Sequence, residues 1–186
     1  MKRILDFSIA VLSSLILLFP MLLVAAAIKI SSPGPMLFWS DRVGKNNDLF
    51  RMPKFRTMRF ATPNVATHLL DNPDDYLTSI GALLRKTSLD ELPQLYSILV
   101  GDMSFVGPRP ALFNQYDLIE LRTHYGIHKL TPGLTGWAQI NGRDELPIQD
   151  KVAYDHEYML NKSLWRDMKI FWLTFSKVLA KKDISH

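Results

Sequence analysis

Residues 7–28 form an apolar run without a formal charge, and Pro20 lies near its middle. A helix of about 20 apolar residues crosses the hydrocarbon layer of a bilayer, so this run is long enough to span a membrane. A proline inside a helix removes a backbone donor and clashes with the preceding turn. We therefore expect a membrane helix that kinks or breaks at Pro20, and the remaining chain must fold beside it.

Basic residues flank this apolar run on both sides. Lys2 and Arg3 precede it, and Lys29 follows it, with further basic residues up to Arg59. Lys and Arg are enriched on the cytoplasmic side of membrane segments. A helix that dips into the bilayer and returns would keep both flanks on that side, so we expect residues 1–30 to form a re-entrant helix. A single membrane span is the main alternative, ahead of a secretory signal and a buried core helix.

Residues 31–186 are enough for one compact domain. The chain contains no cysteine, which excludes disulfides, thiolate metal ligands and a cysteine nucleophile. Its net charge of +4 suits anionic lipid or phosphate, and equally nucleic acid. The absence of a P-loop and of a dinucleotide fingerprint disfavours ATP-driven and nicotinamide chemistry.

Gly, Pro and Asn residues divide this domain into short elements. Residues 36–39 and 49–60, with Gly44, Asn46 and Asn47 between them, predict a β-hairpin. Residues 61–75 read as a surface loop, residues 101–110 are too rich in Gly and Pro for a long helix, and residues 131–142 hold one short extended piece. Helices are expected at 76–84, from Ser88 onward, and at 111–125 and 163–182. The fold class is therefore α+β and mostly helical.

The expected last helix, at 163–182, is amphipathic. Its aromatic and apolar residues recur at helical spacing opposite lysines. This pattern is typical of a helix lying in the bilayer interface, and it fits a helix packed on the domain core equally well.

The acidic pair Asp90 and Glu91 is the sharpest local signal for chemistry. Ser88 and Glu91 also fit a helix capping box, with Ser88 as the N-cap. The two interpretations are compatible, because a carboxylate at a helix start stays ionised and can bind a divalent cation or attack phosphorus. Two hard oxygen donors suit Mg²⁺ that also holds substrate phosphates, so we predict Asp90 and Glu91 as metal ligands.

Scattered basic residues are the candidates for phosphate or nucleotide contact, although single arginines are often ordinary surface. The strongest is Arg109, because Pro108 and Pro110 stiffen its backbone and its planar fork suits phosphate. Neither a basic helix nor an aromatic sheet face indicates nucleic acid, and His124 and His128 lack the glutamate of a zinc motif. A phosphate-handling site at headgroup level is predicted. The full candidate set is Lys54, Arg56, Arg85, Arg109 and Arg143.

Four ordered motifs carry a family resemblance: KFRTM at 54–58, SLDELPQL at 88–95, GDMSFVGPRP at 101–110, and PGLTG at 132–136 followed by NGR at 141–143. They resemble the bacterial sugar transferases, in particular the small monotopic phosphoglycosyl transferases. The resemblance implies transfer of sugar 1-phosphate from a UDP-sugar to undecaprenyl phosphate, with release of UMP, as the first membrane step of a bacterial glycan pathway. It places the chain at the cytoplasmic face of the inner membrane, on a helix broken at Pro20.

The resemblance also assigns roles. Asp90 would attack the β-phosphate and form a phosphosugar intermediate, Glu91 would place metal and phosphate, and Mg²⁺ would be the cofactor. Asp155 and Asp167 occupy family-like positions without an assigned role. The larger relatives have additional membrane segments, so this chain resembles a minimal catalytic form.

Several points stay open at the level of sequence. The sugar is not identified, and a second copy of the chain and downstream glycosyltransferases are the protein partners to consider. A noncatalytic membrane adaptor that binds anionic lipid or nucleic acid is the alternative from another functional class.

Overall fold

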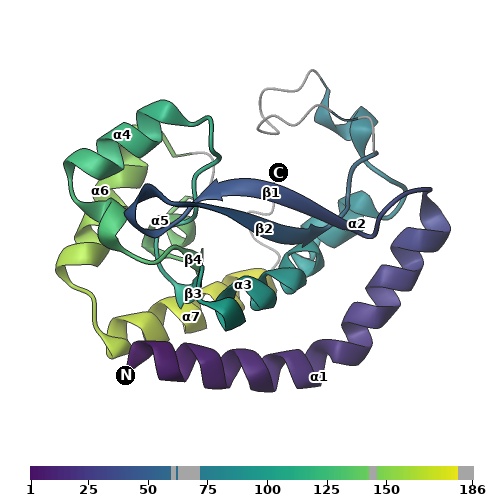
Figure 1. Cartoon of the computed structure of the whole chain (residues 1–186), viewed down its shortest axis with the longest axis horizontal. Helices are drawn as coiled ribbons and strands as arrows, with labels where there is room; N and C mark the ends of the chain where they lie inside the picture. The colour runs from purple at the N-terminus through teal and green to yellow at the C-terminus, as the bar shows by residue number, and fades with distance from the viewer. Residues whose placement is uncertain (60–61, 63–71, 143–145, 180–186) are drawn as a thin grey trace.

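The structure is a computed structural model, and it describes residues 1–59, 62, 72–142 and 146–179. Helices predominate over two small β-sheets, which confirms the predicted mixed, mostly helical class (Figure 1). Most of the predicted loop at 61–75 lies outside the described residues, as does Arg143.

Helix α1 (Lys2–Ser31) contains the apolar run. Its backbone stays helical through Pro20, and Figure 1 shows its two halves running in different directions. Among the residues of α1, only Asp6, Ala10 and Ile28 are buried, so its large apolar side chains mostly lack protein neighbours. Of the described helices, α1 alone is long and apolar enough to cross a membrane. So little burial does not fit the core-helix interpretation.

Strands β1 (Leu37–Val43) and β2 (Leu49–Phe55) form the predicted hairpin, with Leu37 opposite Phe55 and Val43 opposite Leu49. A short 3-10 turn, η1 (Lys45–Asn47), connects them. Asn46 and Asn47 have φ values of 56° and 66°, a left-handed conformation that Asn tolerates. The second strand ends at Phe55, before the predicted limit, because the residues that follow pair with a different segment, as when Thr78 N donates to the Thr57 carbonyl at 2.9 Å.

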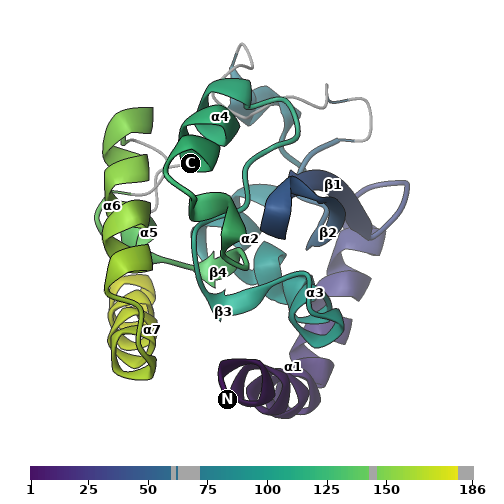
Figure 2. The same ribbon diagram turned by 60° about the vertical axis from the view of Figure 1, so that its left-hand side comes forward.

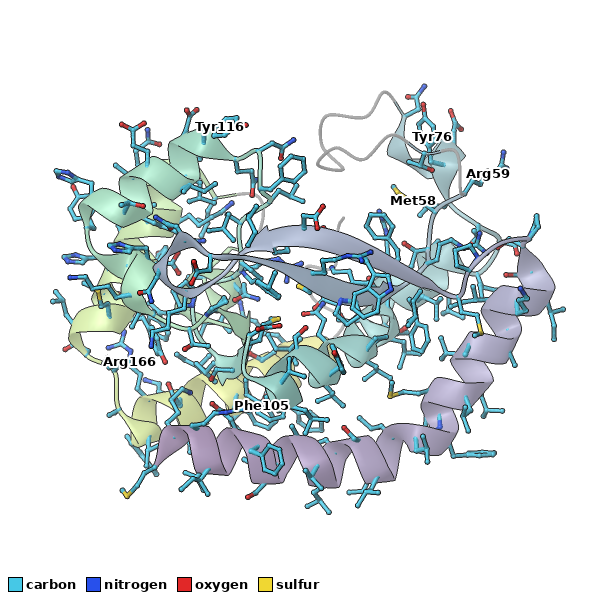
Figure 3. All side chains as sticks on the ribbon, in the orientation of Figure 1. Met58, Arg59, Tyr76, Phe105, Tyr116 and Arg166 are labelled. Atoms are coloured by element: carbon cyan, nitrogen blue, oxygen red, sulfur yellow. The ribbon has the colours of Figure 1, made fainter. Side chains whose placement is uncertain are left out.

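After β2 the chain runs alongside the segment that precedes α2 (Gly81–Lys86). Arg59 N donates to the Tyr76 carbonyl at 2.8 Å, and Met58 bridges Leu77 (Figure 3). The helix predicted over 76–84 is therefore wrong in its first half, because the backbone around Leu77 pairs with another segment instead of coiling. Pro73–Tyr76 forms the 3-10 turn η3 just before it.

Strands β3 (Ser104–Val106) and β4 (Gly133–Thr135) pair in parallel at the centre of the molecule (Figure 2). This confirms that residues 101–110 avoid a helix and that residues 131–142 hold one short strand. The backbones pack very closely beyond the strands, since a Cβ on Gly133 would lie 2.1 Å from Gly107 N and one on Gly136 would lie 2.2 Å from Gly107 O. Only glycine permits this approach, and it fixes the start of the loop that carries Arg109.

Four of the described helices in the second half of the chain surround this sheet. These helices are α4 (Tyr116–His124), α5 (Trp137–Ile140), α6 (Ile148–Leu160) and α7 (Leu164–Leu179), and the 3-10 turn η5 (Ile127–Lys129) follows α4. Helix α4 begins five residues later than predicted, because Ala111 and Leu112 pair with β1 through Val43 and Arg42. The predictions included neither α6 nor α5, and α5 lies within 131–142, where a loop with one short extended piece was expected.

Helix α7 has two faces with different surroundings. Ile170 is fully buried, and the ring of Phe171 lies 6.0 Å from that of Phe105. The other side exposes Trp165 (82%) and Trp172 (68%). The helix therefore packs on the core and also presents an uncovered aromatic face.

A polar network joins the N-terminal half of α1 to α7 and β3. Lys2 Nζ lies 2.6 Å from Asp167 Oδ2, and the Tyr158 hydroxyl donates to Asp167 Oδ1 at 2.7 Å. Ser104 Oγ donates to the buried Asp6 Oδ2 at 2.8 Å. Asp167, which had no assigned role, thus holds α1 and α6 to α7.

Candidate functional site

Glu91 is the centre of the candidate site, and one of its oxygens binds two cations. Lys54 Nζ from β2 lies 2.8 Å from Glu91 Oε1, and Arg109 Nη2 lies 3.0 Å from the same oxygen. The side chains of Lys54, Glu91 and Arg109 keep 17%, 20% and 27% of their surface exposed. The structure therefore brings together three predicted residues from three separate motifs, and each keeps part of its side chain exposed.

The electrostatics of this cluster follow from its shape. Burial alone would raise the pKa of Glu91, but the opposing charges and hydrogen bonds of Lys54 and Arg109 outweigh burial and hold this pKa well below its usual range. Glu91 is therefore ionised at neutral pH, and the three side chains together carry a net positive charge. Such a cluster favours an anionic ligand.

Asp90 precedes Glu91 in the 3-10 helix η4 (Leu89–Gln94), which continues into α3 (Leu95–Val100). Successive residues of a 3-10 helix point about 120° apart, so the two carboxylates leave the backbone in different directions. Asp90 is 8% exposed. It is thus a largely buried carboxylate, next in sequence to the glutamate that binds the two cations.

The predicted capping box at Ser88 is wrong. Ser88 has φ 56°, in the left-handed region, and its side chain makes no capping hydrogen bond. Glu91 also fails to reach back to Ser88, because its carboxylate is engaged by Lys54 and Arg109. Non-Gly residues in this conformation are uncommon overall, and those that occur are concentrated at functional sites.

Two other predicted basic residues lie in different surroundings. Arg56 is 5% exposed, and its guanidinium donates to Ser32 and to the Pro33 carbonyl, where it holds the chain just after α1. Arg85 Nε donates to Thr57 Oγ1 at 3.0 Å, which places it between α2 and the end of β2. Arg56 therefore has a structural task that sequence alone did not reveal, and we do not include it in the proposed phosphate site.

Asp155 proves to be the buried partner of Arg122, a residue that the motifs did not single out. Arg122 also donates to the carbonyl of Arg109. The only sequence signal for this pair is a charged residue on the apolar face of each helix, α4 and α6.

The donor set for a divalent cation consists of Asp90 and Glu91. The described residues contain no group of three or more His, Asp or Glu side chains that could hold a metal alone. Mg²⁺ commonly uses one or two carboxylates together with substrate phosphates and water, so this donor set is compatible with it.

The model of the bacterial sugar transferase family matches residues 1–181. The chain is 40% identical over 190 residues to the UDP-glucose:undecaprenyl-phosphate glucose-1-phosphate transferase of Escherichia coli K12, covering 98% of this chain and 41% of that protein. It is 36% identical over 185 residues to the UDP-N-acetylgalactosamine-undecaprenyl-phosphate N-acetylgalactosaminephosphotransferase of Aeromonas hydrophila, covering 96% of this chain and 44% of that protein.

A relative of similar size is the uncharacterized sugar transferase EpsL of Bacillus subtilis, 40% identical over 191 residues, with 99% of this chain and 90% of the relative covered. The chain spans about two fifths of the length of the Escherichia and Aeromonas relatives. The match over nearly the whole chain confirms the predicted resemblance, and the chain belongs to the bacterial sugar transferase family.

Proposed function

We propose that this protein transfers sugar 1-phosphate from a UDP-sugar to undecaprenyl phosphate. The observation that carries the proposal is the convergence of Lys54 and Arg109 on Glu91, the residue that follows the buried Asp90. Cations held in a fixed, half-buried arrangement suit the developing charge of a diphosphate. The names of the Escherichia and Aeromonas relatives describe sugar-phosphate transfer to the same lipid phosphate.

The proposed chemistry has two displacement steps at one phosphorus atom. Asp90 attacks the β-phosphorus of the UDP-sugar, a new P–O bond forms to the carboxylate, and the bond to the UMP oxygen breaks with its electron pair leaving on UMP. A phosphate oxygen of undecaprenyl phosphate then attacks the same phosphorus and releases the Asp90 carboxylate. Splitting the reaction lets the soluble product leave before the lipid substrate reacts.

Lys54, Arg109 and Glu91 have distinct tasks in this scheme. The two cations bind the donor diphosphate and stabilise the charge of the leaving phosphate. Glu91 holds both cations in place before the substrate arrives. Mg²⁺, held by Asp90 and Glu91 together with the substrate, would supply further neutralisation of the diphosphate charge.

The location proposed for this chemistry is the cytoplasmic face of the bacterial inner membrane. Helix α1 exposes its apolar side chains and α7 exposes Trp165 and Trp172, so both suit contact with lipid. We propose that α1 is re-entrant, because the contact of Lys2 with Asp167 keeps the start of α1 beside the domain that follows its other end.

The central test is whether UMP release needs the acceptor lipid. Purified protein in detergent, incubated with a panel of UDP-sugars and Mg²⁺ but no lipid phosphate, is expected to release about one UMP per enzyme with the correct sugar. Addition of undecaprenyl phosphate should give continuous turnover, and chelation of Mg²⁺ should stop it. Release that requires both substrates from the first turnover contradicts the covalent scheme, and no release with any sugar contradicts the proposed function.

The topology of α1 is testable with single cysteines, because the chain contains none of its own. One cysteine is inserted after Met1 and another replaces the exposed Asp150. A membrane-impermeant maleimide is expected to label both positions in inside-out vesicles and neither in intact spheroplasts. Labelling of the two positions in opposite preparations would establish a single span instead.

A further inference from the structure

Arg122 on α4 and Asp155 on α6 form a buried ion pair that also contacts the loop of Arg109. Their exposed fractions are 8% and 1%. Nε and Nη2 of Arg122 donate to Asp155 Oδ2 at 3.0 and 2.5 Å, and Nη1 donates to the carbonyl of Arg109 at 2.7 Å. All three nitrogens of this guanidinium are therefore in use, and they join two helices to the candidate site.

The loop is held mainly through its carbonyl groups. Arg109 lies between two prolines that have no N–H to donate. The Pro108 carbonyl accepts from Gly133 N at 2.9 Å, and the Pro110 carbonyl accepts from Arg42 Nη1 at 3.3 Å. The carbonyl between them belongs to Arg109, and Arg122 is its donor. Arg122 thus supplies the contact closest to the side chain that reaches Glu91.

Stability alone is a weak explanation for this pair. Removing two charges from water costs about as much as their attraction returns, and apolar replacements of buried pairs are often neutral or stabilising. Burial raises the pKa of Asp155 against the opposing effect of Arg122, which shows how unfavourable the site is for a charge. The surrounding cluster of Ala111, Leu118, Ile127 and Val152 would accept apolar side chains.

We infer that Arg122 and Asp155 are positioning residues for Arg109. Asp155 orients the Arg122 guanidinium, Arg122 fixes the Arg109 carbonyl, and the Arg109 side chain is thereby held on Glu91 and on the donor diphosphate. The last step rests on the proposed function, whereas the hold on the loop does not.

The decisive variant combines Arg122→Met with Asp155→Leu, which removes the donor to the Arg109 carbonyl without leaving a buried charge. We expect a folded protein with a Tm within a few degrees of wild type and kcat for UMP release reduced about 10- to 100-fold, since a displacement of about 1 Å costs rates of that order. Full activity in this folded variant would overturn the inference.

A double-mutant cycle separates positioning from general structural damage. In an Arg109→Lys background, which lacks the fork that is being positioned, the double substitution is expected to cost less than threefold. An equal loss in both backgrounds would overturn the inference. If the apolar variant fails to fold, the same double-mutant cycle is measured with Arg122→Lys in its place, because lysine can still donate one hydrogen bond.

The matched control is the ion pair of Arg166, labelled in Figure 3, with Glu157, which joins α7 to α6 at 2.6 Å. Arg166→Met with Glu157→Gln should leave kcat within twofold. Hydrogen exchange of the peptide covering 105–115 gives a readout independent of turnover, and it should accelerate at least tenfold in the Arg122 variant and not in the control. An inactive wild type would refute the proposed function, while unchanged exchange would refute the positioning role.

Discussion

Asp90→Asn is expected to lower UMP release at least 10³-fold, the order of loss seen when a covalent nucleophile is removed (roughly 10³ to 10⁶). Asparagine has nearly the same shape and can occupy the same buried position, but its amide oxygen is a poor nucleophile and a poor leaving group. The fold should persist because the change keeps the volume of a side chain that is 8% exposed. The measurement is UMP release in the presence and absence of undecaprenyl phosphate.

Intact mass provides the second measurement for this variant. Wild type incubated with the correct UDP-sugar and no lipid should gain the mass of one phosphosugar, and Asp90→Asn should gain none. Asp150→Asn, which changes an exposed aspartate on α6, is the control and should keep both the adduct and the activity. An adduct of full yield on the Asp90 variant would assign the nucleophile to another residue.

Glu91→Gln is expected to reduce kcat about 10²-fold, because Lys54 and Arg109 lose the charge that they share. A neutral amide attracts two cations only weakly, so both side chains should move before the donor binds. Glu157→Gln is the matched control, since this glutamate also pairs with an arginine but lies 46% exposed at the α6–α7 contact. Equal kcat values for the Glu91 variant and wild type would show that Glu91 has no part in the proposed site.

The loss of thermal stability caused by Glu91→Gln is expected to depend on pH. The pKa of Glu91 is lowered by Lys54 and Arg109 despite its burial, so its ion pairs stabilise the folded state at pH values above the ordinary 4.5. This contribution falls as the pH drops below 4.5 toward the folded-state pKa. The Tm difference between wild type and Glu91→Gln should therefore be constant from pH 7 to 5 and shrink below 4.5. A difference that grows on acidification would contradict the ion-pair assignment.

The parts of the fold that were predictable from sequence depend on local chemistry. The hairpin follows from Asn46 and Asn47, which accept the left-handed turn, and the short extended piece expected within 131–142 follows from glycines and prolines that disfavour a helix. The acidic pair and Arg109 could be selected because carboxylates and a proline-flanked arginine are suited to phosphate chemistry. Their convergence could not, because it depends on β2, η4 and the loop after β3 meeting in space.

Other features depend on partners that are distant in sequence. Arg56 carries the same charge as Lys54, two residues away, yet it binds Ser32 and Pro33, because it lies just after the end of β2, where the chain meets the segment that follows α1. The capping box expected at Ser88 does not form, because the Glu91 carboxylate pairs with Lys54 and Arg109, which bind it more strongly than a backbone amide would. Arg122 and Asp155 are 33 residues apart, and no local pattern joins them.

The network at Lys2 and Asp6 has a consequence for biogenesis. Lys2 and its partner Asp167 are separated by 165 residues, and Asp6 and Ser104 by 98. The ribosome synthesises α1 long before it synthesises these two partners. Lys2 and Asp6 lie 3.9 Å apart on α1 and can pair with each other from the start, but their contacts with Asp167 and Ser104 form late, because contacts of such long sequence separation form slowly. Of the described helices, α7 is synthesised last, and its Asp167 completes the attachment of α1 to the domain.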